Sequence, residues 1–144
     1  MFRMVGLMAL PLLVACGSVP LPIGDVFTSP HCHISKEGVT PIIDEQALRG
    51  VIRKSQSGMV GAASPAIPEM NFETTMAYVI SMGSKPTAGY AIQMTGKEAR
   101  YKDGVVGLPV KFIEPGQKMA AQIVTSPCKV ITLPKGDYKR VEMQ

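Results

Sequence analysis

The chain has 144 residues, of which 46% are hydrophobic and 18% charged, with a formal net charge of +4. These values fit a single domain with an apolar core and exclude a highly charged, disordered chain. The basic side chains are scattered, and the densest cluster, Lys135, Lys139 and Arg140, has no aromatic stacking surface beside it. We therefore expect no nucleic-acid partner.

The first 15 residues predict a lipoprotein signal peptide. Arg3 precedes an apolar run at 5–13, about half the roughly 20 residues that a membrane-spanning helix needs. The following Leu13-Val14-Ala15-Cys16 resembles a bacterial lipobox. That resemblance implies cleavage before Cys16, a diacylglycerol on its sulfur, and acylation of the new amino terminus. An ordinary secretory signal is the alternative.

The resemblance also predicts where in the cell the protein is located. Gly17 stands where an aspartate would retain a lipoprotein in the inner membrane of a Gram-negative cell. By this family rule, we expect the chain in the cell envelope, anchored by lipid to the outer membrane and facing the periplasm. Residues 16–30 carry three prolines and few charges, so they predict the lipid anchor and a short tether.

Residues 31–70 predict N-terminal strands, one helix and a loop. Residues 31–43 look extended, with a turn at Glu37-Gly38. Asp44 is a suitable N-cap for a helix through about residue 55, and its apolar side chains recur at helical spacing. They are Ala47, Leu48, Val51 and Ile52. Residues 56–68 are rich in Gly, Ala, Ser and Pro and predict a loop.

Residues 71–144 predict an all-β segment that packs with 31–70 as one unit. Apolar alternation predicts strands at 75–82, 90–95 and 106–112, and three shorter ones follow at 120–124, 128–133 and 138–143. Lys102-Asp103-Gly104 predicts a hairpin turn, Pro115-Gly116 a further turn, and Pro109 an edge or a bulge. The fold class is therefore α+β, a small, mostly antiparallel sheet or sandwich with one helix.

The cysteines and histidines leave structural alternatives open. In an exported protein, Cys32 and Cys128 could form a disulfide or remain two free thiols. If His31-Cys32-His33 is a strand, both imidazoles point one way and Cys32 the other, so the three cannot share one metal without a kink.

The sequence predicts no enzyme. No nucleophile, phosphate-loop or zinc-protease motif occurs, and the histidines sit beside the expected tether. We expect no catalytic residues, no metal, no cofactor and no small-molecule substrate.

The segment Pro86-Thr87-Ala88-Gly89-Tyr90 lies between two predicted strands. Pro86 fixes φ near −65°, and Gly89 suits a positive φ that other residues avoid. The segment is either a structural turn or an exposed recognition loop on a rigid scaffold.

Residues 68–135 resemble the PrcB C-terminal domain family. The features that carry the resemblance are Asn71-Phe72, an alternating strand, Gly83 followed by Pro86–Tyr90, the hairpin at Asp103-Gly104, Pro115-Gly116, Thr125-Ser126-Pro127, and Leu133-Pro134-Lys135. Ala88 replaces the first glycine of the usual pair, and Cys128 replaces an aromatic residue.

The resemblance implies a non-enzymatic, membrane-anchored accessory or stabilising module that binds a protein, with an exported protease as the candidate partner. The candidate partner-binding residues are Pro86, Thr87, Ala88, Gly89, Tyr90, Ser126 and Pro127. Two alternatives stay open. The Pro86–Tyr90 loop is similar to one loop of chagasin-type protease inhibitors, and a structural envelope lipoprotein would also fit the address.

Overall fold

The computed structural model describes residues 17–57, 61, 63, 66–116 and 120–144. The predicted signal peptide and Cys16 lie outside the described residues. The elements found within these ranges are β1 (Val19–Pro22), β2 (Gly24–Ser29), β3 (Glu37–Ile42), α1 (Glu45–Gln56), β4 (Thr75–Met82), β5 (Ala91–Met94), β6 (Glu98–Lys102), β7 (Val105–Leu108), β8 (Val110–Ile113), β9 (Cys128–Pro134) and β10 (Arg140–Met143).

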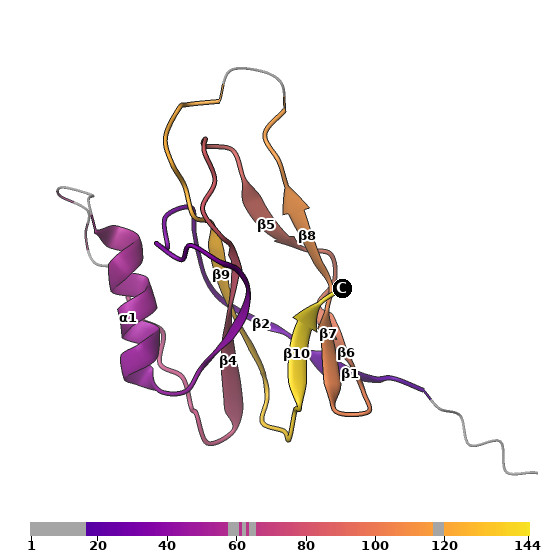
Figure 1. The fold of residues 1–144 in the computed structure, drawn as a ribbon. Helices are drawn as coiled ribbons and strands as arrows, with labels where there is room; N and C mark the ends of the chain where they lie inside the picture. The colour runs from indigo at the N-terminus through magenta and orange to yellow at the C-terminus, as the bar shows by residue number, and fades with distance from the viewer. Residues whose placement is uncertain (1–16, 58–60, 62, 64–65, 117–119) are drawn as a thin grey trace, which may run out of the picture.

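The strands form two four-stranded sheets and one two-stranded ribbon (Figure 1). The first sheet has the order β2-β9-β4-β3 and is antiparallel throughout. The second has the order β1-β6-β7-β10, in which β10 runs parallel to β7. The ribbon pairs β5 with β8. This arrangement confirms the predicted α+β class, and among the strands of the described residues every pair except β7–β10 is antiparallel.

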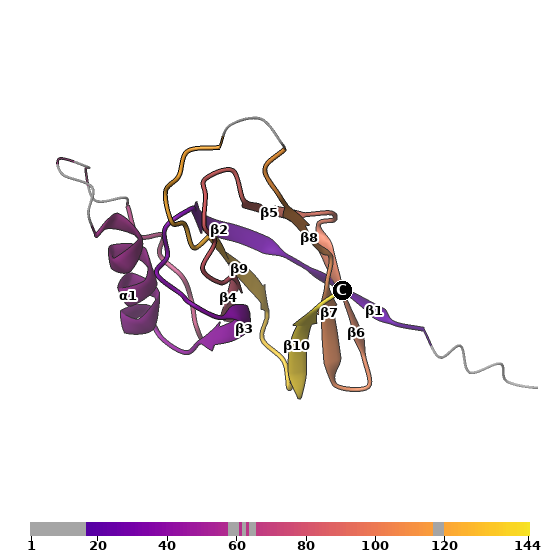
Figure 2. The ribbon, with the colours of Figure 1, turned by 45° about the horizontal axis from the view of Figure 1, so that its top comes forward.

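β4 supplies both cores because its side chains alternate between two faces. Tyr78, Ile80 and Met82 face a cluster shared with the second sheet and the ribbon. Ala77 and Val79 face a second cluster, which lies under α1. The first sheet is therefore the middle layer, with α1 on one side and the second sheet on the other (Figure 2).

The helix has the predicted cap and the predicted apolar stripe. The Asp44 carboxylate accepts a hydrogen bond from the backbone N–H of Ala47 at 2.7 Å, which satisfies one of the free donors of the first turn. Leu48 and Ile52 are buried against the first sheet. These contacts fix α1 on the sheet face.

The expected tether was wrong for most of its length, because residues 19–22 and 24–29 form β1 and β2. β1 is an edge strand, where a missing proline N–H costs little, so Pro20 and Pro22 are tolerated and stay exposed. Leu21 points inward to the first core. The prolines therefore mark a sheet edge.

Three further expectations differ from the structure. Glu37 and Gly38 begin β3 and do not form a turn. The strand expected at 106–112 divides at Pro109 into β7 and β8, which belong to different sheets, because proline cannot continue the ladder. The strand expected at 120–124 is absent, and this segment lies against the Lys85–Ala88 turn.

Candidate functional site

The loop between β4 and β5 is held against the segment before β9. Lys85 N donates to Thr125 O at 2.7 Å, and Thr125 N donates back to Lys85 O at 2.9 Å. Ala88 N donates to Ala121 O at 3.0 Å, and the Thr125 hydroxyl donates to Thr87 O at 2.8 Å. Four hydrogen bonds therefore join two loops that are distant in sequence, and together they form one end of the molecule, here called the loop end (residues 84–90 and 120–125).

The backbone of the loop depends on Gly89. Its φ is +95°, and a Cβ built there would lie 2.7 Å from Pro115 Cβ. The residue before it, Ala88, does not have a positive φ. Ala88 therefore needs no glycine-like conformation, and within residues 86–90 Gly89 alone supplies the left-handed one.

Tyr90 is partly a core residue. Its ring is half-buried and packs against the first core cluster. Lys85 Nζ lies 5.6 Å from the ring centroid, at a cation–π distance. A partner could therefore reach the exposed edge of Tyr90, but part of the side chain is committed to the fold.

Two exposed apolar side chains lie beside this loop. Ile123 is 55% exposed and Val124 is 68% exposed. Sequence reasoning missed them, because the apolar run at 120–124 suggested a half-buried strand. The segment makes its hydrogen bonds to the Lys85–Ala88 turn, and this arrangement leaves both side chains outside the core.

Ser126 and Pro127 are buried, although both are candidate partner residues. Ser126 Oγ accepts from His33 N at 2.7 Å, and the Ser126 backbone bonds Pro30 O and Cys32 N at 2.9 and 3.0 Å. Pro127 O accepts from Met82 N at 3.0 Å. In this structure these groups hold the segment around Cys32 in place and do not lie on the exposed surface.

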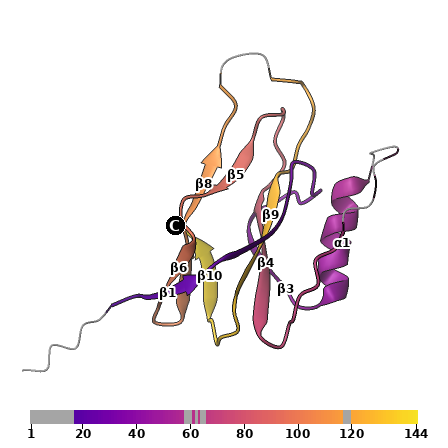
Figure 3. The ribbon, with the colours of Figure 1, turned by 180° about the vertical axis from the view of Figure 1, so that it is seen from behind.

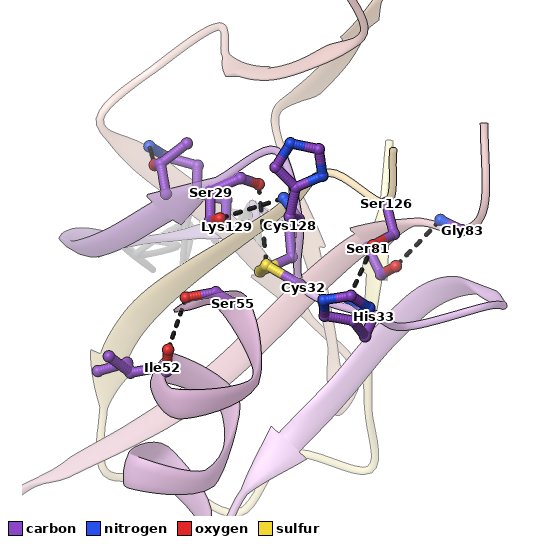
Figure 4. Close-up of a disulfide and its surroundings, with 12 residues drawn as sticks. Ser29, Cys32, His33, Ile52, Ser55, Ser81, Gly83, Ser126, Cys128 and Lys129 are labelled. Atoms are coloured by element: carbon purple, nitrogen blue, oxygen red, sulfur yellow. Dashed lines mark hydrogen bonds between the residues drawn. A yellow bond between two sulfur atoms is a disulfide. The ribbon is translucent and has the colours of Figure 1, made fainter. Parts of the chain in front are cut away.

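Cys32 and Cys128 form a disulfide (Figure 4). Their Cα atoms are 5.8 Å apart, and both residues are fully buried in the second core. The bridge ties the segment before β3 to the start of β9, directly beside the Ser126 contacts. It therefore supports the base of the loop end.

The two histidines do not share one face of a strand. His33 has a φ of +55°, which ends the extended alternation that the sequence suggested. Its Nε2 lies 3.2 Å from Ser57 Oγ at the end of α1. Both histidines, with Ser35, Ser84 and Val124 among others, line a hollow of about 280 Å³. Within the described residues, no group of three or more His, Cys, Asp or Glu side chains could hold a metal ion.

Comparison with protein families identifies one segment of the chain. Residues 76–134 match the PrcB C-terminal family. No curated protein and no solved structure matches the chain significantly. The match confirms the resemblance over β4–β9, which includes both halves of the loop end.

The PrcB C-terminal segment is completed by elements outside the match. β2 and β3 flank β9 and β4 in the first sheet, and β1 and β10 form the edges of the second. α1 covers the second core. The loop end therefore belongs to the PrcB C-terminal segment, while residues before it supply half of the bridge at its base. No helix in the described part of the chain is both long and apolar enough to cross a membrane.

Proposed function

We propose that this protein is a non-enzymatic lipoprotein, anchored through Cys16 to the periplasmic face of the outer membrane, which acts as an accessory module for an exported protease. The observation that carries the proposal is the loop end, a rigid pair of loops with Ile123 and Val124 exposed beside it. Ile123 and Val124 are adjacent and both well exposed, so they can form the apolar centre of a protein contact, with the polar groups of the loop as its rim.

The loop end is preorganised for binding. The four hydrogen bonds between its two loops reduce the conformational entropy that binding a partner would cost. The segment also lies within the PrcB C-terminal match, and that family's name points to a protease complex as the partner. The binding surface therefore comprises Ile123, Val124 and the exposed edge of the Pro86–Tyr90 turn.

The position of the loop end fits an anchored protein. β1, which follows the proposed anchor, lies beside the β6–β7 turn, whereas the loop end lies at the opposite end of the molecule (Figures 1 and 3). An anchor at Cys16 would leave the loop end free to meet a protein in the periplasm.

The test is crosslinking of the lipidated protein in its native envelope, followed by mass spectrometry. We compare the wild type with an Ile123→Asp/Val124→Asp variant, because neither side chain supports the core. Ile43→Asp is the matched control, since Ile43 is 78% exposed and lies between β3 and α1, away from the loop end.

We expect an exported protease to be crosslinked by the wild type and by Ile43→Asp, and to be lost from the double variant at equal abundance of the lipoprotein. Lower protease levels after deletion of this protein would add a stabilising role. Equal recovery with all three proteins would contradict the site, and recovery of no protease would contradict the partner. If the protein were instead an inhibitor, its deletion would raise the protease activity of the envelope.

A further inference from the structure

The outer face of the second sheet carries a group of basic side chains. On β6, Ala99 is fully buried and Tyr101 packs on the first core, so the alternating residues Arg100 and Lys102 point outward and are exposed. Arg140 lies on the same row as Lys102, because both pair with Val105. Arg100, Lys102 and Arg140 are here called the basic face.

The basic face borders a shallow hollow of about 660 Å³. Its lining includes the three basic side chains, Ser18 and Val105, and also two acidic residues, Asp103 and Glu142. Arg140 is paired with Glu142, with 2.7 Å between Nε and Oε2. Among the described residues, neither Arg100 nor Lys102 makes an ion pair, and Arg100 contacts the Ser18 hydroxyl at 3.5 Å. The guanidinium group of Arg100 and the ammonium group of Lys102 are therefore available to an anion.

The chain enters the fold at this hollow. Ser18 lines it, and β1 begins at the next residue, Val19, which pairs with Tyr101. Cys16 precedes Ser18 by two residues, and an extended chain spans at most about 3.6 Å per residue, so a lipid on Cys16 starts within about 7 Å of the Ser18 backbone. At that distance a membrane surface is within one Debye length of the basic face, about 8–10 Å.

We infer that the basic face lies directly on the membrane, where Arg100 and Lys102 bind the phosphate groups of anionic phospholipids. This inference rests on the proposed lipid anchor at Cys16. Glu98 lies on the same face as Arg100 and Lys102, and Asp103 and Glu142 line the hollow, so the acidic groups balance the basic ones. The attraction therefore comes from the position of the two unpaired cations beside the anchor and not from a net charge. The consequence is a fixed orientation of the second sheet, with its outer face on the lipid and the first sheet and α1 on its other side (Figure 2).

The chain contains no tryptophan, so one introduced tryptophan reports on its own position. Val105→Trp places the reporter in the hollow, and Val124→Trp places a control reporter at the loop end. Each lipidated protein is reconstituted into phosphatidylcholine vesicles with or without phosphatidylglycerol, and quenching by brominated acyl chains is measured. If Val105→Trp lowers the melting temperature, Lys139→Trp replaces it, because Lys139 is exposed beside the same turn.

We expect the Val105→Trp emission to be blue-shifted and quenched in vesicles that contain phosphatidylglycerol, and the Val124→Trp emission to be unaffected. Each basic side chain near an anionic surface favours contact about fivefold, so Arg100→Gln/Lys102→Gln should lower the ratio of face-down to all other orientations on the order of 25-fold. Salt at about 1 M should do the same, because it shortens the Debye length to about 3 Å. Arg53→Gln/Lys54→Gln, at the end of α1, is the matched control and should have no effect.

Three results would overturn this inference. They are an unquenched Val105→Trp reporter, quenching that is equal with and without phosphatidylglycerol, and equal quenching of both reporters. Flotation of the vesicles separates this inference from the proposed function. A protein that floats with the vesicles but shows none of the expected quenching keeps its anchor and loses the lipid-binding face. A protein that does not float lacks the anchor, and the inference fails with it.

Discussion

Cys32 and Cys128 are joined across 96 residues of sequence, and their bridge lies directly under the segment that pairs with the Lys85–Ala88 turn. One covalent bond thus connects the N-terminal part of the fold to the strand at the centre of the first sheet. Cys32 lies before the matched family segment, whereas Cys128 lies within it. The bridge therefore joins the matched segment to residues that precede it.

The bridge should supply a large part of the stability. A closed loop of about 100 residues corresponds to about 4.7 kcal/mol in the chain-entropy model. We expect Cys32→Ala/Cys128→Ala to lower the free energy of unfolding by about 2–5 kcal/mol, measured by urea denaturation of the purified protein. The wild type unfolded in the presence of a thiol reductant should show the same loss. If the reductant and the double variant leave the urea midpoint unchanged, the two thiols are free in solution.

Ser126 should act in the fold and not in partner capture. Ser126→Ala removes the acceptor for His33 N, so we expect a loss of about 1–2 kcal/mol in the free energy of unfolding. Ser84→Ala is the control, because Ser84 lines the same hollow but is exposed, and it should change stability little. A Ser126→Ala protein with an unchanged melting temperature but weaker crosslinking to its partner would restore Ser126 as a binding residue.

Local signals in the sequence were enough to predict α1, β4 and the β6–β7 turn. The Asp44 cap, the alternation of β4 and the Asp103-Gly104 turn each depend on residues that are close in sequence, and both turn residues have positive φ. The parallel pairing of β10 with β7 depends on contacts between distant segments, which no local pattern encodes. The prolines of β1 were misleading, because a sheet edge and a tether tolerate proline equally.

The candidate site was predictable only in part for the same reason. The positive φ of Gly89 follows from its place in a turn, and the structure confirms it. The exposure of Ile123 and Val124 does not follow from their sequence, because it arises from hydrogen bonds between residues 121–125 and a loop more than thirty positions earlier. The burial of Ser126 has the same origin, since its partners include Pro30 and His33.

Gly89 and Ala88 should respond differently to substitution. Gly89→Ala forces a left-handed residue to carry a Cβ that would meet Pro115, so we expect a loss of at least about 1–2 kcal/mol in the free energy of unfolding. Ala88→Gly restores the family's glycine pair at a position that does not need it, so its cost should stay below about 1 kcal/mol. Chemical denaturation of both variants measures the difference. Equal effects would mean that the turn does not depend on the φ of Gly89.

Tyr138 should make stability depend on alkaline pH. Its hydroxyl donates to Pro134 O at 2.6 Å and its ring lies 5.8 Å from that of Tyr101. Burial raises the pKa of Tyr138, and the charge of Tyr101 raises it further. Burial also raises the pKa of Tyr78, and the charge of Tyr138 adds to that shift. A raised pKa in the folded state means that folding favours the neutral phenol. The stability is therefore fully present below the unfolded pKa of about 10 and is lost as the pH rises above it.

Tyr138→Phe tests this linkage. At about pH 8 the variant should be less stable by roughly 1 kcal/mol, because Pro134 O loses its hydrogen bond. Between about pH 9 and about pH 11 the variant should then lose less stability than the wild type, since it lacks one ionising phenol and relieves the charge near Tyr78. All other ionisable groups are common to the two proteins, so the difference between the two urea-denaturation series isolates Tyr138. Parallel series would show that the Tyr138 phenol ionises as readily in the folded protein as in the unfolded chain.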